Sequence, residues 1–414
     1  MRIAVLLASL AACGGGRGAP DAACVTSISG TVYAPNGTLP LWNVAVYVPA
    51  SDPGAFGDGV ACGRCTLPGA PVIAMATDAH GHFSLTGAPA GDAIPLVITT
   101  GKWRRQLVVP HVEACQDTAL DADRTRLPRV RSEGDIPRIA ISTGANDGLE
   151  CLIRKLGISD LEITTDAQGG RVHLYSDRQS PGQGANRFAT DFPGGRGFFG
   201  DSAALWTDAQ KLLGYDLVML SCEGAQYPAT KPQVAMDAIQ TYANAGGRLY
   251  LSHWHDIWIE GATQRPSQGQ IPKDWPSIAT FDETQPVLPD GSVDTVDSST
   301  PDGAALATWL GSGDIPLGAG TGKQTCTRVD PARADTFVRH GDAPQMFQFT
   351  TPVDTTPEVR CGKVAFTDMH VSGDSTSTIA VPFPGGCATT ELTPQEKALA
   401  FMLFDLGSCL GDLL

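Results

Sequence analysis

The sequence predicts an N-terminal all-β sandwich followed by a C-terminal α/β domain with a doubly wound sheet. The chain has 414 residues, which is more than one hydrophobic core usually organises. Residues 24–117 contain short apolar runs separated by glycine and proline turns, a pattern typical of a sandwich. Residues 137–414 contain short apolar runs that alternate with helical periodicity, as in a parallel sheet covered on both faces. We expect a linker at residues 118–136.

Residues 1–23 are expected to form a lipoprotein signal peptide and tether. Arg2 precedes an apolar segment at residues 3–10, which is too short to span a bilayer. The letters LAAC at residues 10–13 resemble a bacterial lipobox, which implies a lipidated Cys13 and a membrane anchor in the cell envelope. Position 14 is not Asp, which by the same resemblance favours the outer membrane. The alternative is an ordinary secretory signal with an incidental cysteine.

The cysteine count agrees with export, because disulfides persist in oxidising compartments. Without Cys13, an even set of disulfide candidates remains: Cys24, Cys62, Cys65, Cys115, Cys151, Cys222, Cys326, Cys361, Cys387 and Cys409. Four of them precede residue 120 and six follow residue 150, so we expect each domain to pair its cysteines internally. For the pair at 62 and 65, we expect a bridge to Cys24 or Cys115, or a local bridge, rather than a zinc or redox motif.

The charge excludes one class of partner. The net charge is −15 and the pI is about 4.8, and no basic run compensates for it. A protein that binds a nucleic-acid backbone needs clustered positive charge, so we expect no nucleic-acid partner.

In the first domain, apolar runs predict strands at residues 28–33, 44–48, 94–99 and 106–109, with an Asn-Gly turn at 36–37. The segments GTVYAPNGTLPLWNVAVYV and TDAHGHFSLTGAPAG resemble the carboxypeptidase regulatory-like domain, a transthyretin-like β-sandwich, over residues 26–112. The resemblance implies a non-catalytic spacer or adhesive module, with an insertion at residues 51–71. His80 and His82 are interpreted as a polar turn, because two histidines without a third ligand do not make a metal site.

In the second domain, we expect strands at residues 139–141, 161–165, 171–175, 217–220, 249–251 and 363–367, and helices at 149–156, 203–213, 232–245 and 393–406. Asp147 is expected to cap the first of these helices, and Thr393 and Glu396 to form a capping box on the last. The glycine-rich stretch at residues 182–201 lacks the ending of a phosphate-binding loop and is interpreted as a surface loop. Residues 257–360 predict a long irregular insertion with one helix at 303–310, which we expect to form a lid or partner surface.

Chemically active side chains follow three of the predicted strands. They are Cys222 and Glu223 after the strand at 217–220, His253, His255 and Asp256 after the strand at 249–251, and Asp368 and His370 after the strand at 363–367. Ligands of open α/β sheets bind outside the carboxyl ends of the strands. The sequence therefore predicts a site at this edge.

The segments YDLVML, AIQTYANAGGRLYLSH and GKVAFTDMH resemble the class I glutamine amidotransferase-like superfamily, in particular its ThuA-like branch, over residues 137–256 and 361–406. The resemblance implies a flavodoxin-like sheet. It places His253 where the family has its nucleophilic cysteine, and His370 where the family has its catalytic histidine. The family's glutamate falls on Ser372. Glutamine hydrolysis is therefore not expected.

Two functions stay open at this point. The first is a non-catalytic protein whose polar rim, beside Trp254 and Trp258, binds a carbohydrate or a protein. The second is a His- or metal-dependent hydrolase of a carbohydrate or related extracellular substrate, in which a divalent metal is held by His253, His255 and His370. No cofactor is certain. The hydrolase needs His253 and His370 within a few ångströms of one another in an open cleft, and Cys222 is expected in a disulfide rather than as a nucleophile.

Overall fold

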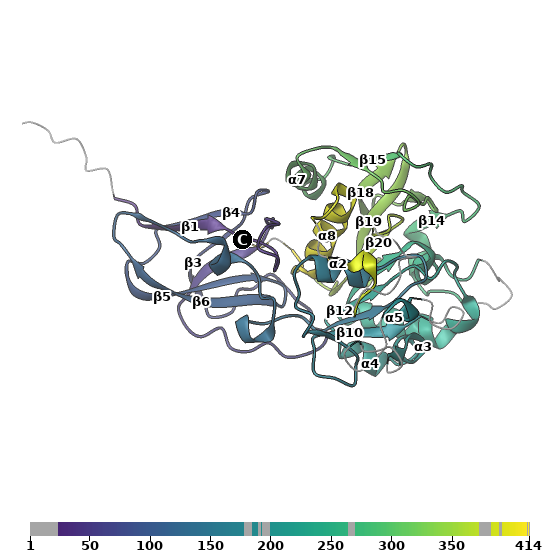
Figure 1. Ribbon diagram of the computed structural model, residues 1–414, viewed down its shortest axis with the longest axis horizontal. Coiled ribbons are helices and arrows are strands. Elements are labelled where there is room, and N and C mark those ends of the chain that lie inside the picture. The colour runs from purple at the N-terminus through teal and green to yellow at the C-terminus, as the bar shows by residue number, and fades with distance from the viewer. Residues whose placement is uncertain are drawn as a thin grey trace, which may run out of the picture.

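A computed structural model gives the fold, with a β-rich N-terminal part beside a larger α/β part (Figure 1). The structure describes residues 24–177, 184–188, 192, 199–263, 270–371, 382–388, 391–411 and 413. The expected signal segment with Cys13, and Ser372, lie outside the described residues. Among the helices that are described, we find none with the length and apolar character needed to cross a membrane.

The β-rich part consists of two facing sheets. One sheet has the order β4-β1-β7 and the other β3-β2-β5-β6. Their strands are β1 (Ser27–Thr31), β2 (Ala45–Pro49), β3 (Pro71–Ala76), β4 (His82–Thr86), β5 (Gly91–Thr100), β6 (Trp103–Val112) and β7 (Asp117–Ala119). Side chains alternate between buried and exposed along β4, as expected of a strand with one face on a core. The sequence did not predict β3, whose side chains are only partly buried, or β7, which begins where the linker was expected.

The α/β part is organised around one large sheet with the strand order β11-β10-β8-β12-β13-β20-β19-β18-β15-β16. Strands β8, β10, β12, β13 and β20 run parallel to one another, which agrees with the predicted α/β class. Their bounds, with the short strands beside them, are β8 (Ile139–Ser142), β9 (Ile163–Thr164), β10 (Val172–Ser176), β11 (Gly200–Asp201), β12 (Leu217–Leu220), β13 (Arg248–Ser252) and β20 (Gly362–Thr367).

The prediction of an irregular insertion at residues 257–360 was wrong. This segment forms β14 (Ala279–Phe281), β15 (Val293–Val296), β16 (Asp314–Pro316), β17 (Cys326–Val329), β18 (Ala334–His340) and β19 (Ala343–Thr351). Strand β19 pairs antiparallel with β20, and β18, β15 and β16 extend the sheet further. The reason lies in buried polar residues such as Gln345 and Gln348, which interrupt the apolar run of β19 and hide the strand pattern.

The helices cover both faces of this sheet, except α1, which packs on strand β1 of the β-rich part. They are α1 (Ala122–Thr125), α2 (Leu149–Lys155), α3 (Ser202–Trp206), α4 (Ala209–Leu213), α5 (Gln233–Asn244), α6 (Ile257–Glu260), α7 (Pro301–Leu310) and α8 (Pro394–Gly407). Short 3-10 helices lie at Arg131–Glu133, Ala185–Arg187, Pro228–Thr230, His253–Asp256, Trp275–Ser277 and Gly385–Cys387. The helix expected at residues 203–213 is two helices, because Asp208 accepts from the backbone N–H groups of Gln210 and Lys211 and starts a new helix.

Helix α8 joins the two parts of the molecule. Its predicted capping box between Thr393 and Glu396 is present. The helix is buried nearly all round, so it packs on the sheet with one face and on the β-rich part with another. Trp42 stacks on Phe401, and the rings of Trp103 and Phe404 lie 5.3 Å apart. One hydrophobic core therefore runs from the sandwich into the α/β part.

The cysteines pair differently from the prediction. Cys24–Cys115 and Cys151–Cys387 each lie within one part, but Cys62–Cys361 and Cys65–Cys409 connect the β-rich part to the α/β part. Cys222 and Cys326 are free and buried, so the expectation of ten paired cysteines was wrong. Spacing could not show this, because the segment between β2 and β3 reaches across to the other part, where Arg64 donates to the carbonyls of Pro357 and Arg360.

Two segments that the sequence predicted as a linker and a surface loop contain buried side chains. In the expected linker, the side chain of Leu127 is fully buried and Arg126 forms an ion pair with Glu133. In the expected surface loop at residues 182–201, the described aromatic side chains are buried and pack edge-on against one another: Phe188, Phe192 and Phe199, together with Phe383.

The disulfide pattern makes a direct prediction for a version of the chain that starts at Gly14. We expect a non-reducing peptide map to show the four bridges above. We also expect Cys222 and Cys326 to resist iodoacetamide in the folded protein and to be alkylated after unfolding, because both thiols are buried. A bridged peptide that contains Cys222 or Cys326 would contradict the structure.

Candidate functional site

The candidate site forms where four neighbouring parallel strands end. Strands β8, β12, β13 and β20 are adjacent in the sheet, so the loops that follow them meet at one edge. Gly144, in the loop after β8, lies directly against the loop after β12. A Cβ atom at this position would lie 2.3 Å from the carbonyl oxygen of Cys222, so only glycine allows the two loops to approach so closely.

Cys222, His253 and His370 come together at this edge. One ligating atom of each, a sulfur or a ring nitrogen, lies within 4.8 Å of the other two. The Cys222 Sγ is 3.4 Å from His253 Nδ1, and the rings of His253 and His370 are 5.2 Å apart. All three side chains are buried, His253 being the most accessible at 6% exposure. The two histidines are therefore close, but they do not line an open cleft.

His253 occupies the sharp turn that ends β13. Its φ is +45°, a left-handed conformation that is energetically unfavourable for residues other than glycine. The turn passes directly into a 3-10 helix at His253–Asp256, which redirects the chain out of the sheet. Burial, with the nearby His370, Lys323 and His255, holds the pKa of His253 well below its usual range, so the imidazole is neutral.

His370 is held with one ring nitrogen directed at this cluster. Its Nε2 atom is buried and has no hydrogen-bond partner among the described residues. Burial lowers the pKa of His370, while Asp147 and a hydrogen bond to the backbone of Asn146 partly oppose this. The ring is therefore neutral. One ring nitrogen of His370 lies within 4.8 Å of the ligating atoms of Cys222 and His253.

Asp147 supports this arrangement and does not cap helix α2 as predicted. Gly148 is the N-cap of α2, without a side-chain hydrogen bond. The Asp147 carboxylate instead accepts from the backbone N–H of Val371 at 2.8 Å and from the Ser252 hydroxyl at 2.5 Å. It connects the loops after β8, β13 and β20, which a helix-capping pattern cannot indicate.

Cys222 is a buried thiol with donors around it. The backbone N–H groups of Gly224 and Trp254 donate to its sulfur, while burial raises the pKa of the thiol well above its usual range. A protonated thiol is a poor nucleophile, so the geometry does not favour thiol catalysis. A bound metal cation would displace the thiol proton of Cys222. The resulting thiolate would still accept from the backbone N–H groups of Gly224 and Trp254.

His255 does not join the cluster. Its Nε2 donates to the Ser221 carbonyl at 3.0 Å, and its Nδ1 accepts from the Trp258 indole N–H at 2.9 Å. Burial lowers the pKa of His255 to about 3. Both nitrogens are satisfied, so His255 is a structural residue rather than a metal ligand. Trp258 is also buried, so the exposed aromatic patch of Trp254 and Trp258 that the sequence suggested is not formed.

Glu223 and Asp256 also lie apart from the cluster. Glu223 forms a fully buried ion pair with Lys231. Asp256 joins a carboxylate cluster with Glu260 and Glu283, in which the side-chain amide of Gln226 donates to all three carboxylates. Sequence reasoning missed Glu260 and Glu283 because they lie in segments assigned to the irregular insertion.

The cluster of Cys222, His253 and His370 fits a soft divalent metal such as Zn²⁺. Zinc binds cysteine sulfur at about 2.3 Å and histidine nitrogen at about 2.0–2.1 Å in tetrahedral geometry, which separates sulfur from nitrogen by about 3.6 Å. The observed separation of 3.4 Å is close to this value. One thiol and two neutral imidazoles, one of which has a ring nitrogen without a partner among the described residues, make a donor set that suits such an ion.

Comparisons with known proteins show no family. No protein-family model matches the chain, and no curated protein matches it. Among solved structures, a cytoplasmic protein from Salmonella typhimurium is similar with a TM-score of 0.35 and 14% sequence identity. The match covers 66% of this chain and 98% of that protein.

The carboxylate cluster predicts a pH-dependent effect of Glu260→Gln. Burial, together with Asp256 and Glu283, raises the pKa of Glu260 to about 10, whereas an unfolded glutamate titrates near about 4.3. The folded state therefore binds more protons, so this group stabilises the fold at low pH and loses that contribution as pH rises above about 4.3. Glutamine imitates the neutral, protonated side chain and binds no proton in either state, so the variant does not need to take up a proton on folding. We expect Glu260→Gln to raise the free energy of unfolding by about 1 kcal/mol at pH 8 and to leave it unchanged at pH 4.

Urea unfolding at the two pH values measures this effect, with the exposed Glu391→Gln as the control. An equal effect of Glu260→Gln at pH 4 and pH 8 would contradict the raised pKa of Glu260.

Proposed function

We propose that this chain is an exported, envelope-anchored binding protein whose sheet-edge site holds one Zn²⁺ or similar soft divalent ion through Cys222, His253 and His370. The convergence of these three ligating atoms within 4.8 Å carries the proposal. They come from three different strand ends, so the fold itself assembles the set. The second support is His370 Nε2, a buried ring nitrogen without a partner in the described part of the chain, since such a group is costly unless something binds it.

We further propose that the α/β part is an amidotransferase-like domain of the ThuA-like kind, carried on a carboxypeptidase regulatory-like sandwich. The parallel order of β10, β8, β12, β13 and β20 supports this, as do His253 on the turn after β13 and His370 after β20. Glutamine amidotransferase chemistry is not part of the proposal, because histidine stands at the nucleophile position. The anchor is proposed at Cys13 in the outer membrane, and the macromolecular ligand is proposed to be a carbohydrate or a protein.

A second candidate function rests on the number of ligands. Three protein ligands leave one position of a tetrahedral ion open, as catalytic zinc sites do, and a bound ion would supply an activated water to a hydrolase. The burial of all three ligands favours the binding protein over this hydrolase.

The metal site predicts one tight Zn²⁺ per folded chain. We expect isothermal titration of the chelator-treated protein, with its disulfides intact, to give a stoichiometry of one, and Zn²⁺ to raise the Tm. Cys222→Ser and His370→Ala should each weaken binding at least about 10-fold, because each removes a ligand. The Co²⁺ form should show a sulfur-to-cobalt charge-transfer band that Cys222→Ser abolishes.

Cys326→Ser is the matched control, since Cys326 is the other buried free thiol. It should keep both the stoichiometry and the charge-transfer band. Binding that survives in both Cys222→Ser and His370→Ala would overturn the proposed site, and so would the absence of any Zn²⁺ binding to the wild-type chain.

The open coordination position separates the two candidate functions. Azide added to the Co²⁺ form should leave the visible spectrum unchanged if the buried ion is closed to solvent, as the binding protein requires. A saturable spectral change would show an exchangeable position and favour the hydrolase.

A further inference from the structure

The segment CGRC at residues 62–65 is attached to the α/β part at both of its cysteines. Cys62 is bonded to Cys361, which lies directly before strand β20, and Cys65 is bonded to Cys409, which follows helix α8. Cys62 and Cys65 are also three residues apart in the sequence, a spacing at which two cysteines can close a disulfide on each other. Each cysteine of the segment therefore has a distant partner, to which it is bonded, and a neighbouring one.

The backbone of this segment is tightly turned. The Arg64 N–H donates to the Cys62 carbonyl at 3.0 Å, and the Thr66 N–H donates to the Arg64 carbonyl at 2.7 Å. Hydrogen bonds between residues two apart are those of γ-turns, which shorten the chain. Bonded cysteines need their Cα atoms within about 4.4–6.8 Å of one another. The turned backbone favours the short separation that a bridge between Cys62 and Cys65 requires.

A small molecule can reach both bridges. Cys62 is exposed and Cys65 is half-buried. Together with Cys409 they line a cavity of about 790 Å³ between the β-rich part and the α/β part. This volume is within the range of about 300–1,000 Å³ that is usual for small-molecule sites. A small dithiol therefore has room to approach the sulfur atoms.

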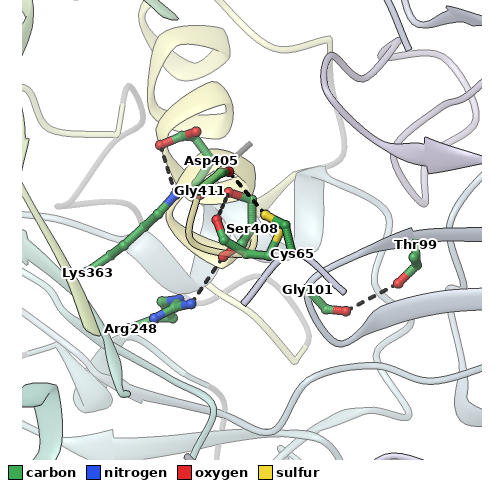
Figure 2. Close-up of a disulfide and its surroundings, with 9 residues drawn as sticks. Cys65, Thr99, Gly101, Arg248, Lys363, Asp405, Ser408 and Gly411 are labelled. Atoms are coloured by element: carbon green, nitrogen blue, oxygen red, sulfur yellow. Dashed lines mark hydrogen bonds and ion pairs between the residues drawn. A yellow bond between two sulfur atoms is a disulfide. The ribbon is translucent and has the colours of Figure 1, made fainter. Parts of the chain in front are cut away.

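Two guanidinium groups lie beside the cysteines of the α/β part. Arg248 donates to the Cys361 carbonyl and to the carbonyl directly before Cys409, and Figure 2 shows it next to the Cys65 bridge. Arg64 donates to the carbonyl directly before Cys361. Positive charge stabilises a thiolate, and a stabilised thiolate is the better leaving group in disulfide exchange. We therefore expect Cys361 and Cys409 to be the sulfurs that leave when the bridges are attacked.

We propose that residues 62–65 are a site of thiol–disulfide exchange with a dithiol, at which one two-electron reduction opens both bridges to the α/β part. One thiolate of the dithiol attacks Cys65 Sγ, and Cys409 leaves as a thiolate. The second thiol of the dithiol closes a cyclic disulfide and releases Cys65 as a thiolate. Cys65 then attacks Cys62 Sγ, which forms the Cys62–Cys65 bridge and releases Cys361. The dithiol is oxidised by two electrons, and its two protons pass through solvent to Cys361 and Cys409.

The exchange releases a segment and does not separate the two parts. The segment between β2 and β3 loses both covalent attachments to the α/β part, while the core that the two parts share remains. Because this segment lines the cavity, one wall of the cavity becomes free to move. The lining of the cavity does not include Cys222, His253 or His370, so this proposal stands independently of the metal site.

The test treats the oxidised protein with a limiting amount of dithiothreitol at pH 7.5 and then alkylates all free thiols with N-ethylmaleimide in acidic denaturant. A non-reducing peptide map of the first product should show alkylated Cys361 and Cys409 and a bridge between Cys62 and Cys65. The exposed Cys24–Cys115 bridge is the matched control, because no third cysteine lies beside it in the sequence. Reduction of this bridge should leave both of its own cysteines alkylated.

Cys62→Ser combined with Cys361→Ser keeps the Cys65–Cys409 bridge and removes the sulfur that Cys65 attacks. Reduction of that bridge should then need at least about 10-fold more dithiothreitol, because exchange no longer consumes the Cys65 thiolate. An unchanged requirement would overturn the proposal.

The peptide map of the wild-type protein stays decisive if the double variant fails to fold, which its Tm would show. A first product with alkylated Cys65 and Cys409 and an intact Cys62–Cys361 bridge would overturn the proposal. A first product with all four cysteines alkylated would overturn it as well, and so would resistance of both bridges under conditions that reduce Cys24–Cys115.

Discussion

The burial of helix α8 on nearly every side is the constraint on which the rest of the structure depends. A helix on the surface of a sheet normally leaves one face in water. Here the side chains of Phe401 and Phe404 pack on Trp42 and Trp103 of the β-rich part. Full burial of such side chains stabilises a fold by about 1.5–3 kcal/mol each. The two parts of the chain are therefore joined by a shared core and not merely by a linker.

The same helix supports both the candidate site and the contact between the two parts. At its N-terminal end, the Gln395 amide donates to the His370 carbonyl at 2.5 Å, and Glu396 forms a buried ion pair with Lys155 of helix α2. At its C-terminal end, the Asp405 carbonyl and the Ser408 hydroxyl accept from Lys363 Nζ on strand β20. Buried ion pairs contribute little net stability, but they fix where the charged groups lie. The loop that carries His370 and the start of strand β20 are thus held by one helix.

The sequence predicted those features that depend on local patterns. The strand at Leu217–Leu220 and the capping box of Thr393 and Glu396 lie where apolar runs and capping chemistry placed them. The meeting of strand ends at one edge follows from parallel strands alone. Three features depend on tertiary contacts and were out of reach: the disulfides at Cys62 and Cys65, the strands within residues 257–360, and the carboxylate cluster around Glu260.

His255 shows how a local change of geometry overturns a reasonable expectation. Residues two apart on a strand point to the same side, so His253 and His255 would both face the site if β13 continued. The chain instead enters a 3-10 helix at His253, in which each residue turns by about 120° and residues two apart diverge. His253 therefore faces Cys222 while His255 faces Ser221 and Trp258.

The two free thiols among the described residues are both buried, but their surroundings differ. Among the described cysteines, eight form disulfides, and Cys222 and Cys326 do not. Both Cys222 and Cys326 are buried, and burial raises the pKa of both thiols. Cys326 Sγ lies 3.7 Å from the Arg328 carbonyl and, within the described part of the chain, belongs to no cluster of metal-ligating side chains. Cys222 lies against His253, which has a positive φ on the turn after β13. The loop of His370 is held by the Gln395 amide, which donates to the His370 carbonyl. Burial does not require such an arrangement, whereas coordination of a metal ion does.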